Sequence, residues 1–174
     1  MFLVDSHCHL DQLDLSAYNG DLSRALVFAR DLGVSYMLCV CITLKDFPAM
    51  LKIIESQPNV SASVGLHPNE TDIEKEPTAS DLMLLAQHEK VIAIGETGLD
   101  YYRSSGDLTW QRERFRQHIY TAKEINKPLI VHMREATQDT LRILREEQNL
   151  PMVAVCVVPD VFFSSLDVFC RAPP

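Results

Sequence analysis

The stretch Val91-Ile92-Ala93-Ile94-Gly95-Glu96-Thr97-Gly98 decides the fold class, because a short apolar run passes directly into a polar segment. Four consecutive apolar residues are typical of a strand that is buried on both faces, as in a parallel sheet. Gly95 and Gly98 suit a tight loop with close approach of another backbone. Glu96 follows the buried run, where a carboxylate is costly unless it is paired or binds a cation. The stretch therefore predicts a buried strand that delivers one acidic side chain to the end of a sheet.

Similar apolar runs lie on both sides of this strand and alternate with segments of helical periodicity. The predicted strands are 2–4, 36–42, 60–66, 91–94, 129–131 and 152–158, and the predicted helices are 21–32, 44–56, 80–88, 108–125 and 136–147. Gly33 suits the left-handed position after the first helix, and Asp107 is placed to cap the fourth. The alternation predicts a parallel sheet built from βα units.

The expected fold is α/β, an incomplete TIM (β/α)8 barrel of about five to six βα units. A closed barrel needs eight such units and typically about 250 residues, whereas this chain has 174. An open doubly wound sheet would fit the length, but no glycine-rich phosphate loop follows any predicted strand.

Composition and charge narrow the class of function. The net charge of −8 argues against a broad basic face that grips nucleic acid. It permits an enzyme that acts on a phosphodiester, because bound divalent cations supply local positive charge. The five cysteines are scattered in the sequence, three of them in apolar runs, which favours a reduced compartment over a disulfide framework. With no signal peptide and no membrane-spanning run, we expect a cytoplasmic protein without membrane contact or an obligate protein partner.

Histidines follow two other predicted strands at matching positions. His7 and His9 end the first strand two residues apart, so both imidazoles can meet one cation. His132 follows the strand at 129–131. Together with Glu96 they occupy the rim on which a barrel enzyme builds its active site. The alternatives are backbone hydrogen bonds for the histidines and a salt bridge for Glu96; the combination favours a site for zinc, manganese or magnesium.

Two further polar residues are candidates for contact with the substrate. Arg134, two residues after His132, can hold a phosphate oxygen bidentately, and a surface ion pair is its alternative. His67 ends the third strand and is placed to contact substrate or a neighbour of a metal ligand. His88 and His118 fall within predicted helices, where solvent exposure or packing is the simpler interpretation.

Four segments resemble, in the correct order, motifs of the TatD-family metal-dependent deoxyribonucleases. They are FLVDSHCHLD at 2–11, GLHP at 65–68, GETGLDYY at 95–102 and PLIVHMREA at 128–136. The resemblance implies a TIM barrel with two divalent metal ions (zinc, manganese or magnesium). His7 and His9 match ligands of one ion, Glu96 matches a catalytic carboxylate shared by both, and His132 matches a ligand of the second. The implied substrate is DNA, and 3′-exonuclease action on single strands is reported for some members.

The resemblance ends near Asn149. The family places a further histidine in a His-Cys-Phe context and a later aspartate in a Thr-Asp context, and neither motif follows His132. We therefore expect residues 1–149 to form the N-terminal part of a TatD-like barrel. Residues 150–174 are then a divergent tail, such as a frameshift or a truncation produces. Two alternatives stay open: another amidohydrolase-like metal hydrolase acting on an ester, amide or lactone, and a catalytically silent truncated fragment.

Overall fold

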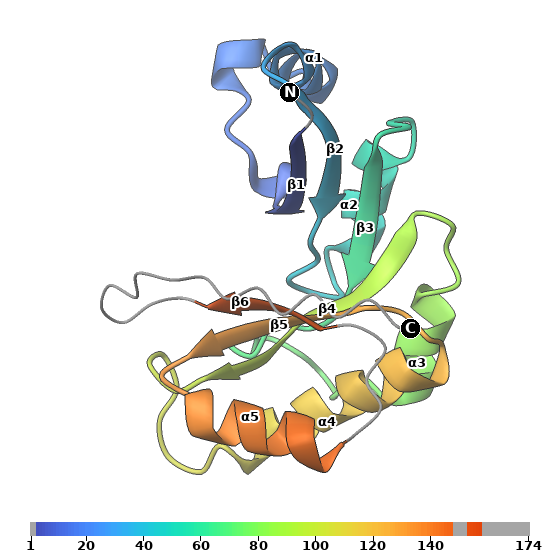
Figure 1. Ribbon diagram of the computed structural model, residues 1–174. Coiled ribbons are helices and arrows are strands. Elements are labelled where there is room, and N and C mark those ends of the chain that lie inside the picture. The colour runs from blue at the N-terminus through green and yellow to red at the C-terminus, as the bar shows by residue number, and fades with distance from the viewer. Residues whose placement is uncertain (1–2, 148–152, 158–174) are drawn as a thin grey trace.

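In the part of the chain that the structure describes, six parallel strands form one sheet, and their order in space follows their order in the chain (Figure 1). The computed structural model describes residues 3–147 together with the backbone of 153–157. The strands are β1 (Leu3–Cys8), β2 (Val34–Cys39), β3 (Val60–Val64), β4 (Val91–Asp100), β5 (Leu129–Arg134) and β6 (Val153–Val157). In Figure 1 β1–β3 and β4–β6 run in clearly different directions, so the sheet curves like part of a barrel wall.

A helix follows each of the first five strands, which confirms the predicted incomplete barrel of βα units. The helices are α1 (Leu22–Asp31), α2 (Phe47–Ile54), α3 (Ala79–Leu85), α4 (Thr109–Glu124) and α5 (Thr137–Glu146). Two short 3-10 turns, Leu10–Gln12 and Ser16–Tyr18, lie between β1 and α1. No helix in the ranges that the structure describes is long and apolar enough to cross a membrane.

Local signals in the sequence explain where the helices begin and end. The Asp21 side chain accepts a hydrogen bond from the backbone N–H of Ser23 and caps α1. Gly33 follows α1 with φ +98°, as predicted for the left-handed position. Asp107 accepts from the backbone N–H of Thr109 at 2.9 Å and so satisfies the first turn of α4 from just before its N-cap.

The core has two parts because alternate residues of each strand point to opposite faces of the sheet. Ile94 and Leu129 join the large cluster under the helices, where Phe115 of α4 is fully buried. Ala93 and Ile130, one residue away, belong to a smaller cluster on the other face. Burial of each large apolar side chain contributes about 1.5–3 kcal/mol. The sheet is thus apolar on both faces, as its sequence predicted.

The fourth strand differs from the sequence prediction. It was expected to end at Ile94 and pass into a loop, but it continues to Asp100. The predicted close approach of the glycine backbone is present within the strand: Gly98 pairs with His132 at φ +136°, and a Cβ on Gly98 would lie 2.2 Å from the His132 carbonyl oxygen. Because β4 is extended, it delivers Glu96 and Asp100 to the end of β5.

The remaining boundaries of the described helices and strands lie close to the predicted ones, with β1 reaching Cys8 instead of Val4. Within the predicted tail at 150–174, the strand expected at 152–158 is present as β6. The rest of that tail lies outside the described residues.

Replacement of Gly98 by alanine should lower the free energy of unfolding by about 3 kcal/mol, since it adds an unfavourable φ to a steric overlap with β5. Gly106→Ala is the matched control. Gly106 also has a positive φ, +84°, but its Cβ would meet nothing within 4 Å, so a loss of about 1 kcal/mol is expected. Urea denaturation of both variants measures the difference, and equal losses would contradict the proposed close packing of β4 on β5.

Candidate metal centre

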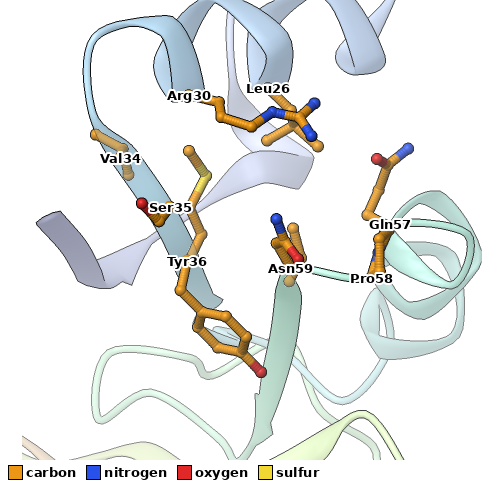
Figure 2. A pocket seen from close by; sticks show the side chains of 10 residues that line it. Leu26, Arg30, Val34, Ser35, Tyr36, Gln57, Pro58 and Asn59 are labelled. Atoms are coloured by element: carbon orange, nitrogen blue, oxygen red, sulfur yellow. The ribbon is translucent and has the colours of Figure 1, made fainter. Parts of the chain in front are cut away.

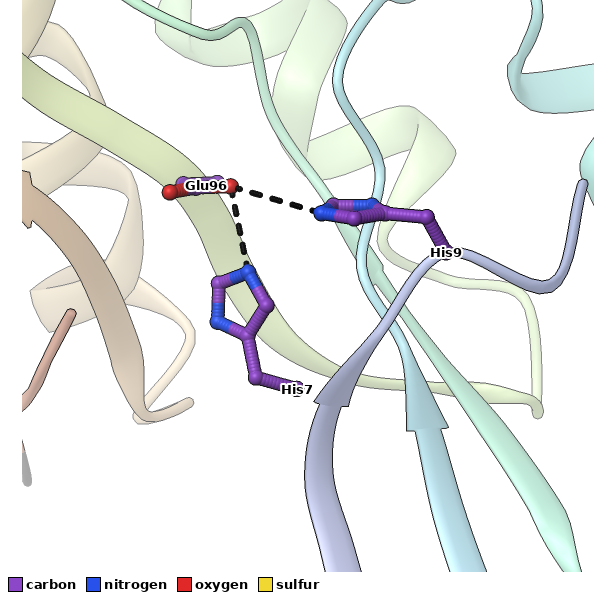
Figure 3. A group of neighbouring side chains, drawn as sticks. All are labelled: His7, His9 and Glu96. Carbon is purple, nitrogen blue, oxygen red and sulfur yellow. Dashed lines mark ion pairs between the residues drawn. The ribbon is translucent and has the colours of Figure 1, made fainter. Parts of the chain in front are cut away.

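A single buried carboxylate lies at the centre of the predicted site. Glu96 is only 4% exposed. Its Oε2 is 3.2 Å from His7 Nε2 and 4.0 Å from His9 Nε2, and its Oε1 is 3.1 Å from His132 Nδ1. Figure 3 shows that both imidazoles at the end of β1 point toward Glu96 on β4. The curvature of the sheet therefore brings β1 and β5 residues to the same side chain.

Two groups of ligand atoms share this carboxylate. The first comprises His7, His9 and Glu96, and the second comprises His67, Glu96 and His132. Within each group the ligand atoms lie within 4.8 Å of one another. Metal–nitrogen and metal–oxygen bonds of about 2 Å span separations close to this. The donor set is one that divalent transition metals accept.

Hydrogen bonds outside the two groups orient the imidazoles for a cation. His9 Nδ1 lies 2.9 Å from the carbonyl oxygen of Val40, which can only accept, so Nδ1 carries the proton and Nε2 presents its lone pair toward Glu96. Asp100 Oδ2, which can only accept when ionised, lies 3.1 Å from His132 Nε2, so Nε2 donates to it and the ring is held with Nδ1 toward Glu96. The lone pair of His9 repels the ionised Glu96 carboxylate unless a cation lies between them. Such outer hydrogen bonds are typical of metal-binding histidines, so the residues fit a bound metal.

The pKa values of the site indicate ionised carboxylates and a neutral histidine. Burial raises the pKa of Glu96, but hydrogen bonds from His132 and His7 outweigh it and hold the pKa well below its usual range. Burial likewise raises the pKa of Asp100, and hydrogen bonds to its carboxylate reverse this effect. Burial and the neighbouring His132 lower the pKa of His67 to about 4. Near neutral pH the carboxylates can therefore hold a cation without first losing a proton.

The two predicted substrate contacts lie in different places. His67 is part of the second ligand group, with Nε2 3.1 Å from His132 Nδ1. Arg134 stacks its guanidinium carbon 3.8 Å above the ring centre of Tyr102, at the ends of β5 and β4. The structure thus brings His67 among the ligand atoms and places Arg134 at the rim beside them.

Asp100 is a candidate site residue that the sequence did not single out. It is 1% exposed, and its Oδ2 accepts hydrogen bonds from His132 Nε2 and, at 2.7 Å, from Asn69 Nδ2. A period-two pattern with Glu96 four residues earlier was the available signal. It was overlooked because the segment was read as a loop and not as a strand.

Two other candidate regions are the cysteines of β1 and β2, which border the proposed ligands, and a cavity at the opposite ends of the strands. Cys8, Cys39 and Cys41 are free thiols near β1 and β2, and burial raises their pKa values to about 12, 11 and 12. They stay protonated near neutral pH and behave as apolar groups. A cavity of about 40 Å³ lies between α1, the start of β2 and the turn before β3, at the opposite ends of the strands (Figure 2).

A larger hollow of about 780 Å³ lies on the same rim as the metal centre. The loops after β2 and β3 line it, with Lys45 from the first and Glu70 and Lys75 from the second. The second of these loops follows β3, which ends at Val64, and it carries His67, a member of the second ligand group.

Comparison with known proteins identifies the family. A sequence profile described as TatD related DNase matches residues 4–170. The chain belongs to the TatD family. The E. coli K12 protein named uncharacterized metal-dependent hydrolase YcfH is 45% identical over 149 residues, which are 85% of this chain and 55% of that protein. The Edwardsiella piscicida protein named 3′-5′ ssDNA/RNA exonuclease TatD is 30% identical over 129 residues, 74% of this chain and 50% of that protein.

Solved TatD-family structures share the fold. The crystal structure of the E. coli K12 TatD homologue YjjV superposes with a TM-score of 0.71 at 25% identity, covering 83% of this chain and 55% of that one. A TatD-family hydrolase from Entamoeba histolytica gives 0.69 at 23% identity, covering 84% and 55%. The chain spans about half the length of the curated relatives it matches. Its sheet therefore corresponds to part of a TatD barrel.

The buried His118 of α4 predicts a pH dependence of stability. Burial lowers its pKa to about 4, from 6.5. Between pH 6.5 and about pH 4 the unfolded chain binds a proton at His118 and the folded chain does not. The stability due to neutral His118 is therefore complete above pH 6.5 and is lost as the pH falls to about 4. The loss is at most about 3 kcal/mol.

Denaturant unfolding between pH 7 and 4 checks this, with His118→Gln compared against wild type. The variant should be less stable at pH 7 and should lose less stability on acidification. His88→Gln, at a half-buried turn position, is the control and should follow the wild-type curve. An unchanged slope in the His118 variant would refute the assignment.

Proposed function

We propose that this site binds two divalent metal ions and hydrolyses phosphodiester bonds of DNA, as a 3′-exonuclease on single strands. The observation that carries the proposal is the buried, ionised Glu96 shared by two groups of imidazoles. The TatD profile and the relative named as an exonuclease support DNA as the substrate. DNA is the proposed partner, and no obligate protein partner is needed for the reaction.

The ligand assignment follows the two groups around Glu96. His7 and His9 would hold one ion, His132 the other, and Glu96 both. His67 lies close enough to His132 to join the second ion or to contact the substrate. Imidazole donors favour zinc or manganese over a site that takes magnesium alone.

The mechanism rests on what these side chains do to the substrate. When bound, the two ions would supply Lewis acidity to the scissile phosphate and to the attacking water. Glu96 keeps its negative charge and holds the site together from the centre. Arg134, held over the Tyr102 ring, would orient a phosphate oxygen through its guanidinium. His67, neutral near pH 7, would donate or accept a hydrogen bond without adding charge.

The rim provides room for a nucleic-acid strand next to the site. The hollow lined by the loops after β2 and β3 carries Lys45 and Lys75, but also Asp46, Glu70, Asp72 and Glu74, so its acidic side chains outnumber the basic ones and the lining itself does not attract phosphate groups. Lys45 also pairs with Asp72 at 3.3 Å, a surface contact that is worth little energy. With a chain of net charge −8, local cations are the main attraction for DNA.

Glu96→Gln tests the proposal because it keeps the shape of the side chain and removes its charge. With a labelled single-stranded oligonucleotide and manganese, the chain should release nucleotides from the 3′ end. Cleavage should stop in excess chelator and fall at least about 100-fold in Glu96→Gln, because the metal geometry is lost. Glu113→Gln, the same change at an exposed position of α4, is the matched control and should retain cleavage.

Three results would contradict the proposal. Undiminished cleavage in excess chelator would exclude metal catalysis. Turnover of an ester or lactone without turnover of DNA would favour the amidohydrolase alternative. Manganese binding without turnover of any of these substrates would favour a catalytically silent fragment.

A further inference from the structure

Helix α4 buries an unusual row of polar side chains against the sheet. Gln111, Arg114 and His118 are spaced three and four residues apart, so they share one face of the helix. Their exposures are 0%, 3% and 0%. A buried polar group is costly unless its hydrogen bonds are made. The contacts of this row therefore indicate what it does.

The row binds the backbone of the loop that carries His67. His118 Nε2 accepts from the N–H of Leu66 at 3.0 Å. Arg114 Nη1 donates to the carbonyl oxygens of His67 at 3.0 Å and Glu70 at 2.7 Å. Gln111 Nε2 donates to the carbonyl oxygen of Pro68 at 3.1 Å. Helix α4 thus fixes the path of the loop on both sides of His67.

Gln111 also reaches the end of β4. Its Oε1 accepts from the backbone N–H of Asp100 at 2.9 Å, while Nε2 donates to Ser104 Oγ at 2.9 Å. Asp100 in turn accepts from His132 through its carboxylate. One amide therefore joins the loop of His67 to the residue that orients His132.

We infer that Gln111 is a positioning residue of the metal centre. It holds the backbone at Asp100 so that the Asp100 carboxylate stays on His132 Nε2 and keeps the imidazole ring oriented toward Glu96. The expected effect of Gln111 on metal binding rests on the proposed function. The expected effect of Gln111 on the His132 ring does not require a metal.

A purely structural role predicts a different outcome from a positioning role. An apolar side chain would fill the buried position of Gln111 equally well. Phe115 and Ile119 are apolar side chains that are fully buried in the same helix. Such a side chain would leave the Asp100 N–H and the Pro68 carbonyl without Gln111 as their partner. Only the positioning role predicts that replacement of Gln111 also changes His132.

Gln111→Met tests this because it keeps the length of the side chain and removes its hydrogen bonds. Manganese affinity, measured calorimetrically on the full chain, should fall about 10-fold or more, in line with the effect of losing other outer partners of metal ligands. In the metal-free chain, the imidazole nitrogen NMR signals of His132 should move from their wild-type positions, because the Asp100 carboxylate no longer holds the ring in one orientation.

Two control variants separate positioning from stability. Thr121→Val removes another buried hydrogen bond of α4, to the carbonyl oxygen of Gln117, and should lower stability without changing His132 or manganese affinity. Gln117→Leu alters an exposed glutamine of the same helix and should change neither. Should Gln111→Met fail to fold, Ser104→Ala takes its place. It removes one partner of the Gln111 amide and should shift both readouts less, in the same direction.

The outcomes distinguish this inference from the proposed function. The inference is overturned if Gln111→Met folds and keeps the wild-type His132 signals and manganese affinity. If Gln111→Met does not fold, a Ser104→Ala variant that changes neither readout overturns it instead. A wild-type chain that binds no manganese overturns the proposed function, and the His132 signals alone then decide the role of Gln111.

Discussion

The structure of this site depends on the burial of one negative charge. Glu96 is almost inaccessible to water, and the described structure surrounds it with imidazoles from β1 and β5. A carboxylate in such a place costs several kcal/mol unless positive charge or hydrogen bonds compensate it. Hydrogen bonds from His132 and His7 compensate it, while the outer hydrogen bond of His9 directs a lone pair toward it. Divalent cations on both sides of the carboxylate would satisfy these groups together.

This requirement explains several features of the fold that packing alone does not. Strand β4 continues past its apolar run so that Glu96 and Asp100 both reach β5. Gly98 lets the two backbones approach closely at that point. Helix α4 gives up apolar surface to hold the neighbouring loop through side chains such as Gln111. Buried hydrogen bonds thus take the place of apolar packing here and fix the arrangement of the proposed metal ligands.

Much of this could be predicted from the sequence. Apolar runs in alternation with helical periodicity were sufficient for the order of the elements. The rule that barrel sites lie at strand ends predicted His7, Glu96 and His132 as site residues, and the structure brings their side chains close together. The continuation of β4 could not be predicted, because glycines and polar residues argue against a strand unless a partner strand approaches. The period-two relation of Asp100 to Glu96 becomes informative only once this segment is known to be a strand. Gln111 could not be predicted, because its contacts are tertiary hydrogen bonds that leave no local pattern in the sequence.

The central claim is that cations bind on both sides of the Glu96 carboxylate. Anomalous X-ray diffraction from crystals of the chain soaked in manganese tests it most directly. The account predicts two anomalous peaks, one among His7, His9 and Glu96 and the other beside Glu96 and His132, each about 2 Å from its ligand atoms. Peaks elsewhere, or none at saturating manganese with the side chains arranged as described, would contradict it.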